Sequence, residues 1–233
     1  MLILGLNKTT LLDYPEHVAA TIFTGGCNFR CPFCHNKNLV LPQQTAAYTE
    51  AEILSFLKKR VGILTGVCIT GGEPTLQKDL SDFLARIKDL GYLIKLDTNG
   101  YQPDVLHNLL SKNLIDYCAM DIKNSPEKYS ITSGLDSCDF HLIEESVSCL
   151  LSLAEHFPFE FRTTLVREFH NKEDMIAISE WIKGAPAYYL QSYTDSENVI
   201  TPGYHALSEQ CLLEYRDICL QNIPNTQLRG IDL

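Results

Sequence analysis

The sequence has no apolar run long enough to span a bilayer, and it lacks the features of a secretory leader. Its N-terminal Met-Leu-Ile-Leu-Gly-Leu is apolar, but no basic residue precedes it and Lys8 interrupts it. A transmembrane helix needs about 20 mostly apolar residues, and a signal peptide needs a basic region before its apolar core. We therefore expect no membrane association, no secretion and a cytoplasmic location.

Clusters of positive charge are also missing. The chain has 19 Lys and Arg against 29 Asp and Glu, a formal net charge of −10. A protein that binds the phosphate backbone of a nucleic acid needs a positive surface, so we expect no nucleic-acid partner. With 45% apolar and 21% charged residues, the composition is that of an ordinary globular protein with a sizeable core.

No low-complexity linker divides the chain, so we expect one domain over residues 1–233 with short extensions at both ends. Short apolar runs alternate with helical patterns, which is the sequence form of repeated βα units and a parallel sheet. The expected strands are 18–23, 67–70, 92–97, 115–121, 159–166 and 187–191. The expected helices are about 49–60, 77–90, 103–111, 140–157, 172–183 and 207–221, and the tail 226–233 is expected to be an edge strand or an arm.

Six βα units fall short of the eight in a closed barrel. We therefore predict an α/β fold that forms a partial, laterally open (β/α)6 barrel, with an open doubly wound sheet as the alternative. In both folds, ligands bind beyond the C-terminal ends of the parallel strands. Four polar segments follow four successive strands there: the loop 27–34, Gly71–Pro74, Asp97–Asn99 and Asp121–Lys123.

What the sequence does have is nine cysteines, of which Cys27, Cys31 and Cys34 lie within eight residues. An odd number without a leader indicates a reducing compartment rather than a disulfide framework. Thiolates are the usual ligands of iron–sulfur clusters. Three of them would leave one iron of a four-iron cubane open for chemistry, as an open position does in catalytic zinc. A zinc site would need a fourth ligand, and His35 is poorly placed to supply it. The other cysteines are expected to be structural.

Two of the other polar segments have a functional and an ordinary interpretation. Glycines at 71 and 72 would let backbone approach a ligand closely, Glu73 could accept from an ammonium group and Pro74 would stiffen the exit; the alternative is a tight turn with a solvent-facing glutamate. Asp97–Asn99 could bind ribose hydroxyls, or Asn99 could simply form an Asx turn.

Asp121 and Lys123 project from one side of a strand end, because side chains alternate along a strand. A lysine there suits a ligand carboxylate, and Asp121 could orient it. Arg162 and Thr164 alternate inward on the fifth expected strand, where they either face the ligand or form a structural ion pair. Phe33, inside the cysteine loop, could be a core anchor.

The Cys-x3-Cys-x2-Cys spacing, with an aromatic residue before the last cysteine, resembles the signature of radical S-adenosylmethionine (SAM) enzymes. The resemblance implies a [4Fe-4S] cluster on Cys27, Cys31 and Cys34, whose open iron chelates SAM and whose electron cleaves it to methionine and a 5′-deoxyadenosyl radical. We expect SAM to be bound by residues of the four segments and of two later strands: Phe33, Gly71, Gly72, Glu73, Pro74, Asp97, Asn99, Asp121, Lys123, Arg162 and Gln191.

Asp-Thr-Asn-Gly and Asp-x-Lys segments similar to those at 97–100 and 121–123 occur in glycyl-radical-enzyme activases. There they imply a monovalent cation near SAM, for which Asp97, Thr98 and Asp121 are the candidates. A more specific resemblance is to activating proteins of anaerobic ribonucleoside-triphosphate reductase. It is carried by six segments: Lys8–Pro15, Phe23–Cys27, Cys34–Asn36, Gly71–Gln77, Lys95–Gly100 and Ala119–Lys123.

That resemblance implies hydrogen abstraction from one backbone glycine of the reductase, with electrons from a donor such as flavodoxin or ferredoxin. Asp13 and His35 are expected near the peptide substrate. The pattern departs at Glu16, where relatives often have glycine, and this affects the turn into the first expected strand.

Three alternatives stay open. The partner could be another glycyl-radical enzyme such as pyruvate formate-lyase. The substrate could be a small molecule, as for a deazaguanine synthase. The protein could also be a non-catalytic iron–sulfur or zinc module. An inserted ferredoxin-like domain is disfavoured, because no cysteine lies between Cys34 and Val67.

Overall fold

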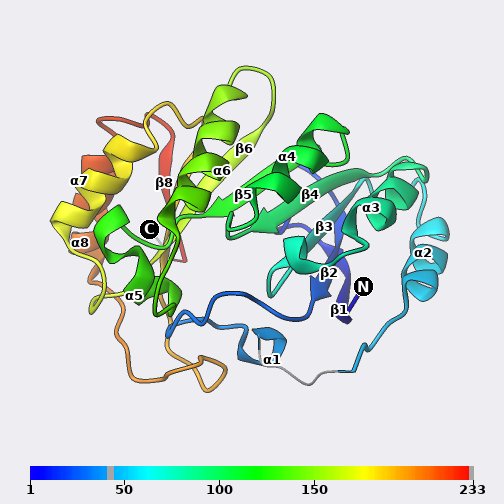
Figure 1. The fold of residues 1–233 in the computed structure, drawn as a ribbon, viewed down its shortest axis with the longest axis horizontal. Helices are drawn as coiled ribbons and strands as arrows, with labels where there is room; N and C mark the ends of the chain where they lie inside the picture. Colours follow the sequence, from blue (N-terminus) through cyan, green and yellow to red (C-terminus); the bar gives the residue numbers. More distant parts are fainter. Residues whose placement is uncertain (41–44, 231–233) are drawn as a thin grey trace. The chain divides into compact units, whose positions relative to one another are not determined.

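The computed structural model describes residues 1–40 and 45–230 (Figure 1). Its strands hydrogen-bond in chain order from β1 to β8 and form an eight-stranded, mostly parallel, open sheet. The chain divides into two compact parts. The N-terminal part contains residues 1–28 and 38–119, and the C-terminal part contains residues 29–37 and those from Met120 onward.

The N-terminal part is built on four strands. Strand β1 (Ile3–Thr10) pairs antiparallel with β2 (Ala19–Thr24), and β2, β3 (Gly66–Gly71) and β4 (Leu93–Thr98) are parallel. Its helices are α2 (Glu50–Lys58), the short 3-10 helix η1 (Pro74–Leu76), α3 (Leu80–Lys88) and α4 (Pro103–Ser111). The expected capping box opens α2, where Thr49 and Glu52 satisfy each other's backbone N–H groups.

The two faces of this parallel sheet differ in chemistry. Residues in register share a face, because side chains alternate along each strand. Ile22, Ile69 and Leu96 are in register and fully buried, which gives one apolar face. Thr21 is in register with Cys68, and Cys68 with Lys95, so the opposite face carries polar side chains.

The C-terminal part contains the parallel strands β6 (Phe159–Leu165), β7 (Tyr188–Ser192) and β8 (Thr226–Arg229). Its helices are η2 (Pro126–Lys128), α5 (Tyr129–Ser133), α6 (Phe140–Ser152), α7 (Lys172–Trp181) and α8 (Glu209–Cys219). Tyr129, Phe161 and Tyr188 are among its largest buried side chains. The short α1 (Lys37–Val40) and β5 (Tyr117–Asp121) each contain a point where the chain passes between the two parts.

The predicted α/β fold with an open sheet is confirmed, and the six expected strands are present as β2 to β7. Strand β8 is the edge strand expected in the tail, whose residues 231–233 lie outside the described range. The prediction missed β1, and it placed the end of α6 at 157 instead of Ser152. That the chain forms one domain stays a prediction. In the ranges 1–40 and 45–230, no helix has both the length and the apolar character needed to span a bilayer.

Candidate active site

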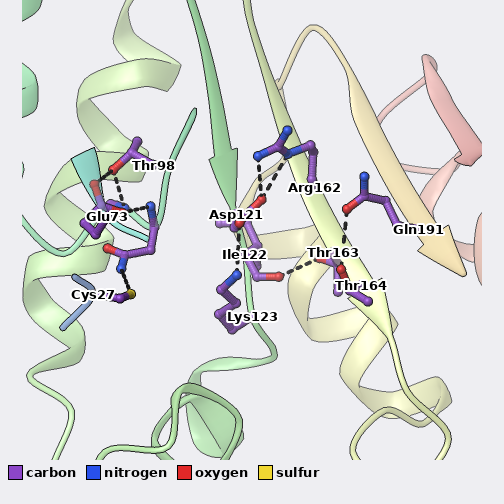
Figure 2. A network of polar contacts seen from close by, with 12 residues as sticks. Cys27, Glu73, Thr98, Asp121, Ile122, Lys123, Arg162, Thr163, Thr164 and Gln191 are labelled. Atoms are coloured by element: carbon purple, nitrogen blue, oxygen red, sulfur yellow. Dashed lines mark hydrogen bonds and ion pairs between the residues drawn. The ribbon is translucent and has the colours of Figure 1, made fainter. Parts of the chain in front are cut away.

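Glu73 is the centre of a buried hydrogen-bond network in the N-terminal part (Figure 2). Its side chain is 1% exposed. Oε1 accepts hydrogen bonds from Thr75 N (3.0 Å), Thr75 Oγ1 (2.6 Å) and Thr98 Oγ1 (2.8 Å), and Oε2 accepts from Asn99 N (2.7 Å). Burial raises the pKa of the Glu73 carboxyl, and the four hydrogen bonds oppose that shift. The alternative of a solvent-facing glutamate is therefore wrong.

The two glycines before Glu73 bring β3 against the backbone that enters the cysteine loop. A Cβ at Gly71, which has φ +125°, would overlap the backbone of Thr24, and a Cβ at Gly72 would overlap the Gly26 carbonyl group. Gly72 N donates to Thr24 O (2.9 Å) and Glu73 N donates to Gly26 O (2.7 Å). The two glycines thus permit a close approach of the chain's own backbone, and an approach toward a ligand stays a prediction.

Asn99 connects this network to the first cysteine. Its Nδ2 lies 3.8 Å from Cys27 Sγ and 2.7 Å from Asn28 Oδ1. Its Oδ1 accepts from Tyr101 N (3.0 Å), which is the Asx turn considered above. The Asn28 Nδ2 atom is buried and has no hydrogen-bond partner within the described residues. An unpartnered buried donor beside a cysteine is consistent with a site that holds a further group.

Asp97 and Thr98, two of the cation candidates, have protein partners. The carboxylate of Asp97 forms an ion pair with Lys95, which is 2% exposed and whose ammonium lies 5.9 Å from the centre of the Tyr117 ring. Thr98 Oγ1 donates to Glu73. The structure therefore gives the predicted cation site no support.

Asp121 lies between two cations in the C-terminal part (Figure 2). Lys123 Nζ is 2.9 Å from Oδ2, and Nε and Nη2 of Arg162 are both 3.0 Å from Oδ1. Burial raises the pKa of the Asp121 carboxyl, but Arg162 and Lys123 outweigh it and lower that pKa to about 2. Burial lowers the pKa of the Lys123 ammonium, but the negative charges of Asp121, Cys31 and Cys34 raise it above its ordinary value.

Three residues with predicted roles take part in these contacts or lie near them. Asp121 does orient Lys123, as expected. Arg162 forms an ion pair with Asp121, and its contact with a ligand stays a prediction. Gln191, at the end of β7, lies beside Thr164, with 3.4 Å between Oε1 and the Thr164 hydroxyl.

The second half of the cysteine loop belongs to the C-terminal part, and it is anchored by Phe33. Cys31 is buried, and Cys34 N donates to Cys31 O (3.0 Å). The Phe33 ring is buried against Phe169, at a centroid distance of 5.4 Å, and His170, at 6.3 Å. Phe33 is therefore a core anchor in this structure, and its contact with SAM stays a prediction.

The segment after β7 is tied to the same loop. Ile200 N donates to Cys34 O (3.1 Å), and Thr201 N donates to Pro32 O (2.8 Å). His35 is exposed, and its Nε2 forms a hydrogen bond with the carbonyl oxygen of Thr194. An exposed imidazole at this position is compatible with the predicted substrate contact.

Asp13 lies in the connection between β1 and β2, where it accepts a hydrogen bond from Thr21. Thr21 is on the polar face of the sheet, the same face as Lys95. The role of Asp13 toward a peptide substrate stays a prediction.

Four residues with roles at the site were missed: Asn28, Thr75, Gly134 and His170. Thr75 and Asn28 follow known motif residues directly, and this proximity was an available signal. His170 Nε2 forms a hydrogen bond (2.9 Å) with the Lys123 carbonyl oxygen, 47 positions away. Gly134 caps α5 with φ +67°, and its missing Cβ leaves room for the Arg30 carbonyl oxygen. The prediction could not place it, because α5 itself was not expected.

The donor set suits an iron–sulfur cluster. Cys27 receives an amide N–H group, and the positive charge of Lys123 acts on Cys31 and Cys34. Hydrogen bonds to the cysteine sulfurs are among the interactions that tune an iron–sulfur cluster. Within the described residues, no three His, Cys, Asp or Glu side chains gather around the position of one ion. A cubane differs in that each thiolate binds a separate iron. Within each part, the surroundings of the cysteines fit ligands of a cluster. Ligation of one cluster by all three thiolates stays a prediction, and the zinc alternative is not tested.

Comparison with known proteins gives the family. The family model described as Radical SAM superfamily matches residues 21–182. A Methanocaldococcus jannaschii protein named "Putative glycyl-radical enzyme activating enzyme" is 33% identical over 199 residues, which cover 82% of this chain and 80% of that protein. A Thermococcus kodakarensis protein named "Probable GTP 3',8-cyclase" is 34% identical over 131 residues, 54% of this chain and 42% of its own length.

A solved structure of similar fold is a radical SAM methyltransferase from Sphaerobacter thermophilus. It has a TM-score of 0.74 at 14% sequence identity and covers 94% of this chain, which in turn covers 69% of it. At that identity, the likeness concerns the fold alone. The family match spans most of the chain and contains all three cysteines, so this protein belongs to the radical SAM superfamily.

Proposed function

We propose that this protein is a glycyl-radical-enzyme activase. The observation that carries the proposal is the 33% identity to the M. jannaschii relative over most of both chains, together with the three-cysteine motif. Membership of the superfamily implies a [4Fe-4S] cluster and SAM. When bound, the reduced cluster supplies the electron that cleaves SAM, and the resulting carbon radical takes a hydrogen atom from the substrate.

The residues of the N-terminal part hold the site's backbone in place. Two of the four bonds to Glu73 hold the Thr98–Asn99 turn, and the other two hold Thr75. The missing Cβ of Gly72 leaves room for the backbone before Cys27. We propose that the polar groups of Gly71–Pro74 bind the amino group of SAM. Because the Glu73 oxygens already accept four hydrogen bonds, backbone carbonyl groups of this segment are better placed than its carboxylate to accept another.

In the C-terminal part, we propose that Lys123 binds the carboxylate of SAM. Asp121 holds its ammonium group, and that group is close enough to Cys31 and Cys34 for their charges to raise its pKa. A cation beside two cluster thiolates would attract an anionic ligand to the same place. Gln191 and Thr164 supply further polar groups, and a monovalent cation at Asp97, Thr98 and Asp121 is not part of the proposal.

We infer that the partner is anaerobic ribonucleoside-triphosphate reductase, whose activating proteins share the six segments noted above. Hydrogen abstraction would convert one of its backbone glycines to a glycyl radical and SAM to methionine and 5′-deoxyadenosine. The required electron would come from a donor such as flavodoxin or ferredoxin. The partial match to the T. kodakarensis protein keeps a small-molecule substrate as the second candidate.

One experiment separates these candidates. The protein is reconstituted anaerobically with iron and sulfide, reduced, and given SAM with the reductase, with pyruvate formate-lyase, or with GTP. We expect a glycyl doublet in electron paramagnetic resonance (EPR) with the reductase alone. A doublet only with pyruvate formate-lyase would change the partner, and consumption of GTP would overturn the activase assignment.

The ligand assignment predicts a loss of function when Cys31 is removed. Cys31→Ala should lose at least 100-fold in SAM cleavage and should hold less iron after reconstitution, because two thiolates retain a cubane poorly. The matched control is Cys211→Ala on α8, which should keep wild-type iron content and turnover. Wild-type turnover by Cys31→Ala would contradict the assignment.

A further inference from the structure

The side chain of Asn99 lies beside the first cysteine of the motif. Its amide nitrogen lies 3.8 Å from Cys27 Sγ, within reach of an N–H···S hydrogen bond, and 2.7 Å from Asn28 Oδ1. An amide nitrogen carries two hydrogens, so it can serve both acceptors at once. We propose that Asn99 is a positioning residue that donates to the Cys27 thiolate and thereby sets the reduction potential of the cluster. This inference rests on the proposed function.

The orientation of the Asn99 amide follows from its surroundings. Its oxygen accepts the backbone N–H of Tyr101 (3.0 Å), so the nitrogen end must face Cys27. A flipped amide would place an oxygen against both the sulfur and Asn28 Oδ1, which are acceptors. The hydrogen-bond network therefore fixes which end of the side chain meets the thiolate.

Asn99 is also held in place by its backbone. Its N–H donates to Glu73 Oε2 (2.7 Å), and the residue is 6% exposed. The preceding Thr98 is buried and donates to the other oxygen of Glu73. A donor fixed at both its backbone and its side chain loses little conformational entropy when it bonds to sulfur. Glu73 thus acts on Cys27 through Asn99, within a single part of the chain.

The chemical consequence concerns the charge on the cluster. Reduction adds one electron, and hydrogen bonds to the cysteine sulfurs stabilise the more negative state. Asn99 also engages Asn28 Oδ1, an acceptor 3.8 Å from the same sulfur that would otherwise repel a thiolate. Loss of the Asn99 donor should therefore make the cluster harder to reduce and lower its midpoint potential.

The test measures that potential directly. Asn99→Asp keeps the acceptor for Tyr101 N but removes both N–H groups, and Asn99→Ala removes the whole amide. Each protein is reconstituted without SAM or partner and titrated with reductant, and the EPR signal of the reduced cluster is followed. The matched control is Asn108→Asp on α4, which adds the same charge at a residue whose amide bonds Ser81.

We expect both Asn99 variants to shift to lower potential, with Asp shifted further than Ala, while Asn108→Asp stays at the wild-type value. SAM affinity of Asn99→Ala should remain within about twofold of wild type. An unchanged potential in Asn99→Ala with four irons retained would overturn the inference. So would an unchanged potential with a large loss of SAM affinity, which would restore the cofactor contact.

If both Asn99 variants fail to hold the cluster, the wild-type protein provides the test. With ¹⁵N-labelled asparagine, pulsed EPR of the reduced cluster should show a weak coupling to an asparagine side-chain nitrogen, and Asn108→Asp should retain it. Absence of the coupling would contradict the inference. A wild-type protein that assembles no cluster would instead contradict the proposed function, so the two failures can be told apart.

Discussion

Two glycines, one in each part of the chain, support the cysteine loop in the same way. Gly72 follows β3, and its missing Cβ leaves room for the carbonyl group of Gly26, the residue before Cys27. Gly134 follows α5, and its missing Cβ leaves room for the carbonyl group of Arg30, the residue before Cys31.

A backbone hydrogen bond accompanies each contact. Glu73 N donates to Gly26 O (2.7 Å), and Arg30 N donates to Ser133 O (2.8 Å). The difference lies in the sequence around the two glycines. Gly72 belongs to a motif that the family resemblance marks, whereas Gly134 lies in an unremarkable Ser-Gly-Leu. Two positions can therefore require glycine for the same steric reason although only one of them lies in a recognisable motif.

The first test of this comparison substitutes alanine for each of the two glycines. Gly72→Ala and Gly134→Ala should each lower the free energy of unfolding by about 3 kcal/mol, because a Cβ would overlap backbone that cannot move aside cheaply. Both should also take up less iron on reconstitution. Urea unfolding of the apoprotein and iron per chain measure the two effects.

Gly91→Ala is the matched control. Gly91 closes α3 with φ +87°, but an added Cβ there meets nothing within 4 Å. Only the cost of a left-handed alanine remains, about 1 kcal/mol, and cluster uptake should be normal. Equal losses in all three variants would mean that backbone conformation, not contact with the cysteine loop, explains the need for glycine.

The carboxylates of the two parts differ more than their glycines do. All four hydrogen-bond donors to Glu73 are neutral groups, whereas Asp121 is held by two cations. Burial raises the pKa of Glu73, so its ionised form disfavours the folded state. The pKa of Asp121 is lowered to about 2, so its ionised form favours the folded state.

Acid should therefore affect the two carboxylates in opposite directions. The contribution of Asp121 is complete above its unfolded pKa of 3.8 and is lost as pH falls toward about 2. Comparing urea unfolding at pH 7 and pH 3, the stability gap between wild type and Asp121→Asn should narrow by about 1 kcal/mol, allowing for solvent screening.

The difference in unfolding free energy between wild type and Glu73→Gln should not decrease from pH 7 to pH 3, because protonation removes the buried charge of Glu73. At pH 7 we expect Glu73→Gln to lose about 2 kcal/mol, since its amide end would face donors. The contrary outcome is that acid reduces the stability difference between wild type and Asp121→Asn and that between wild type and Glu73→Gln by the same amount. That result would mean that the two carboxylates have similar environments, and the predicted difference between them would be wrong.

The sequence predicted features that depend on neighbours in the chain. Apolar runs marked β2 to β7, and Thr49 with Glu52 marked the start of α2. Strand β1 was not predicted, because its residues are mostly half-buried or exposed. In addition, the loop that joins it to β2 has eight residues and is not a tight turn. An apolar N-terminus with this pattern resembles an arm as much as a strand.

The roles of site side chains were less predictable, because their partners come from distant positions. Glu73 meets Thr98 and Asn99, 25 and 26 positions later, and Arg162 meets Asp121, 41 positions earlier. The motifs located Glu73, Thr98, Asn99 and Asp121 correctly at or just after strand ends. They could not tell that Arg162 is occupied by an ion pair, or that Asn99 faces Cys27.

The smallest expected change in unfolding free energy concerns Glu16, a residue other than glycine in a backbone conformation that favours glycine. Glu16 is exposed and has φ +66°. His17 N donates to Tyr14 O (3.2 Å), so Pro15 and Glu16 occupy the centre of a turn whose second central residue is left-handed. Such a turn favours glycine at that position, which is where the sequence was expected to depart from the family pattern.

Glu16→Gly should therefore raise the free energy of unfolding by about 0.5 kcal/mol, because the relief of left-handed strain exceeds the greater freedom of glycine in the unfolded chain. Asn113→Gly is the matched control. Asn113 also has positive φ (+53°), but asparagine tolerates this conformation, so its gain should be smaller. Urea unfolding of the apoprotein measures both. A loss of stability in Glu16→Gly would show that the glutamate stabilises the turn by a contact that outweighs its strain.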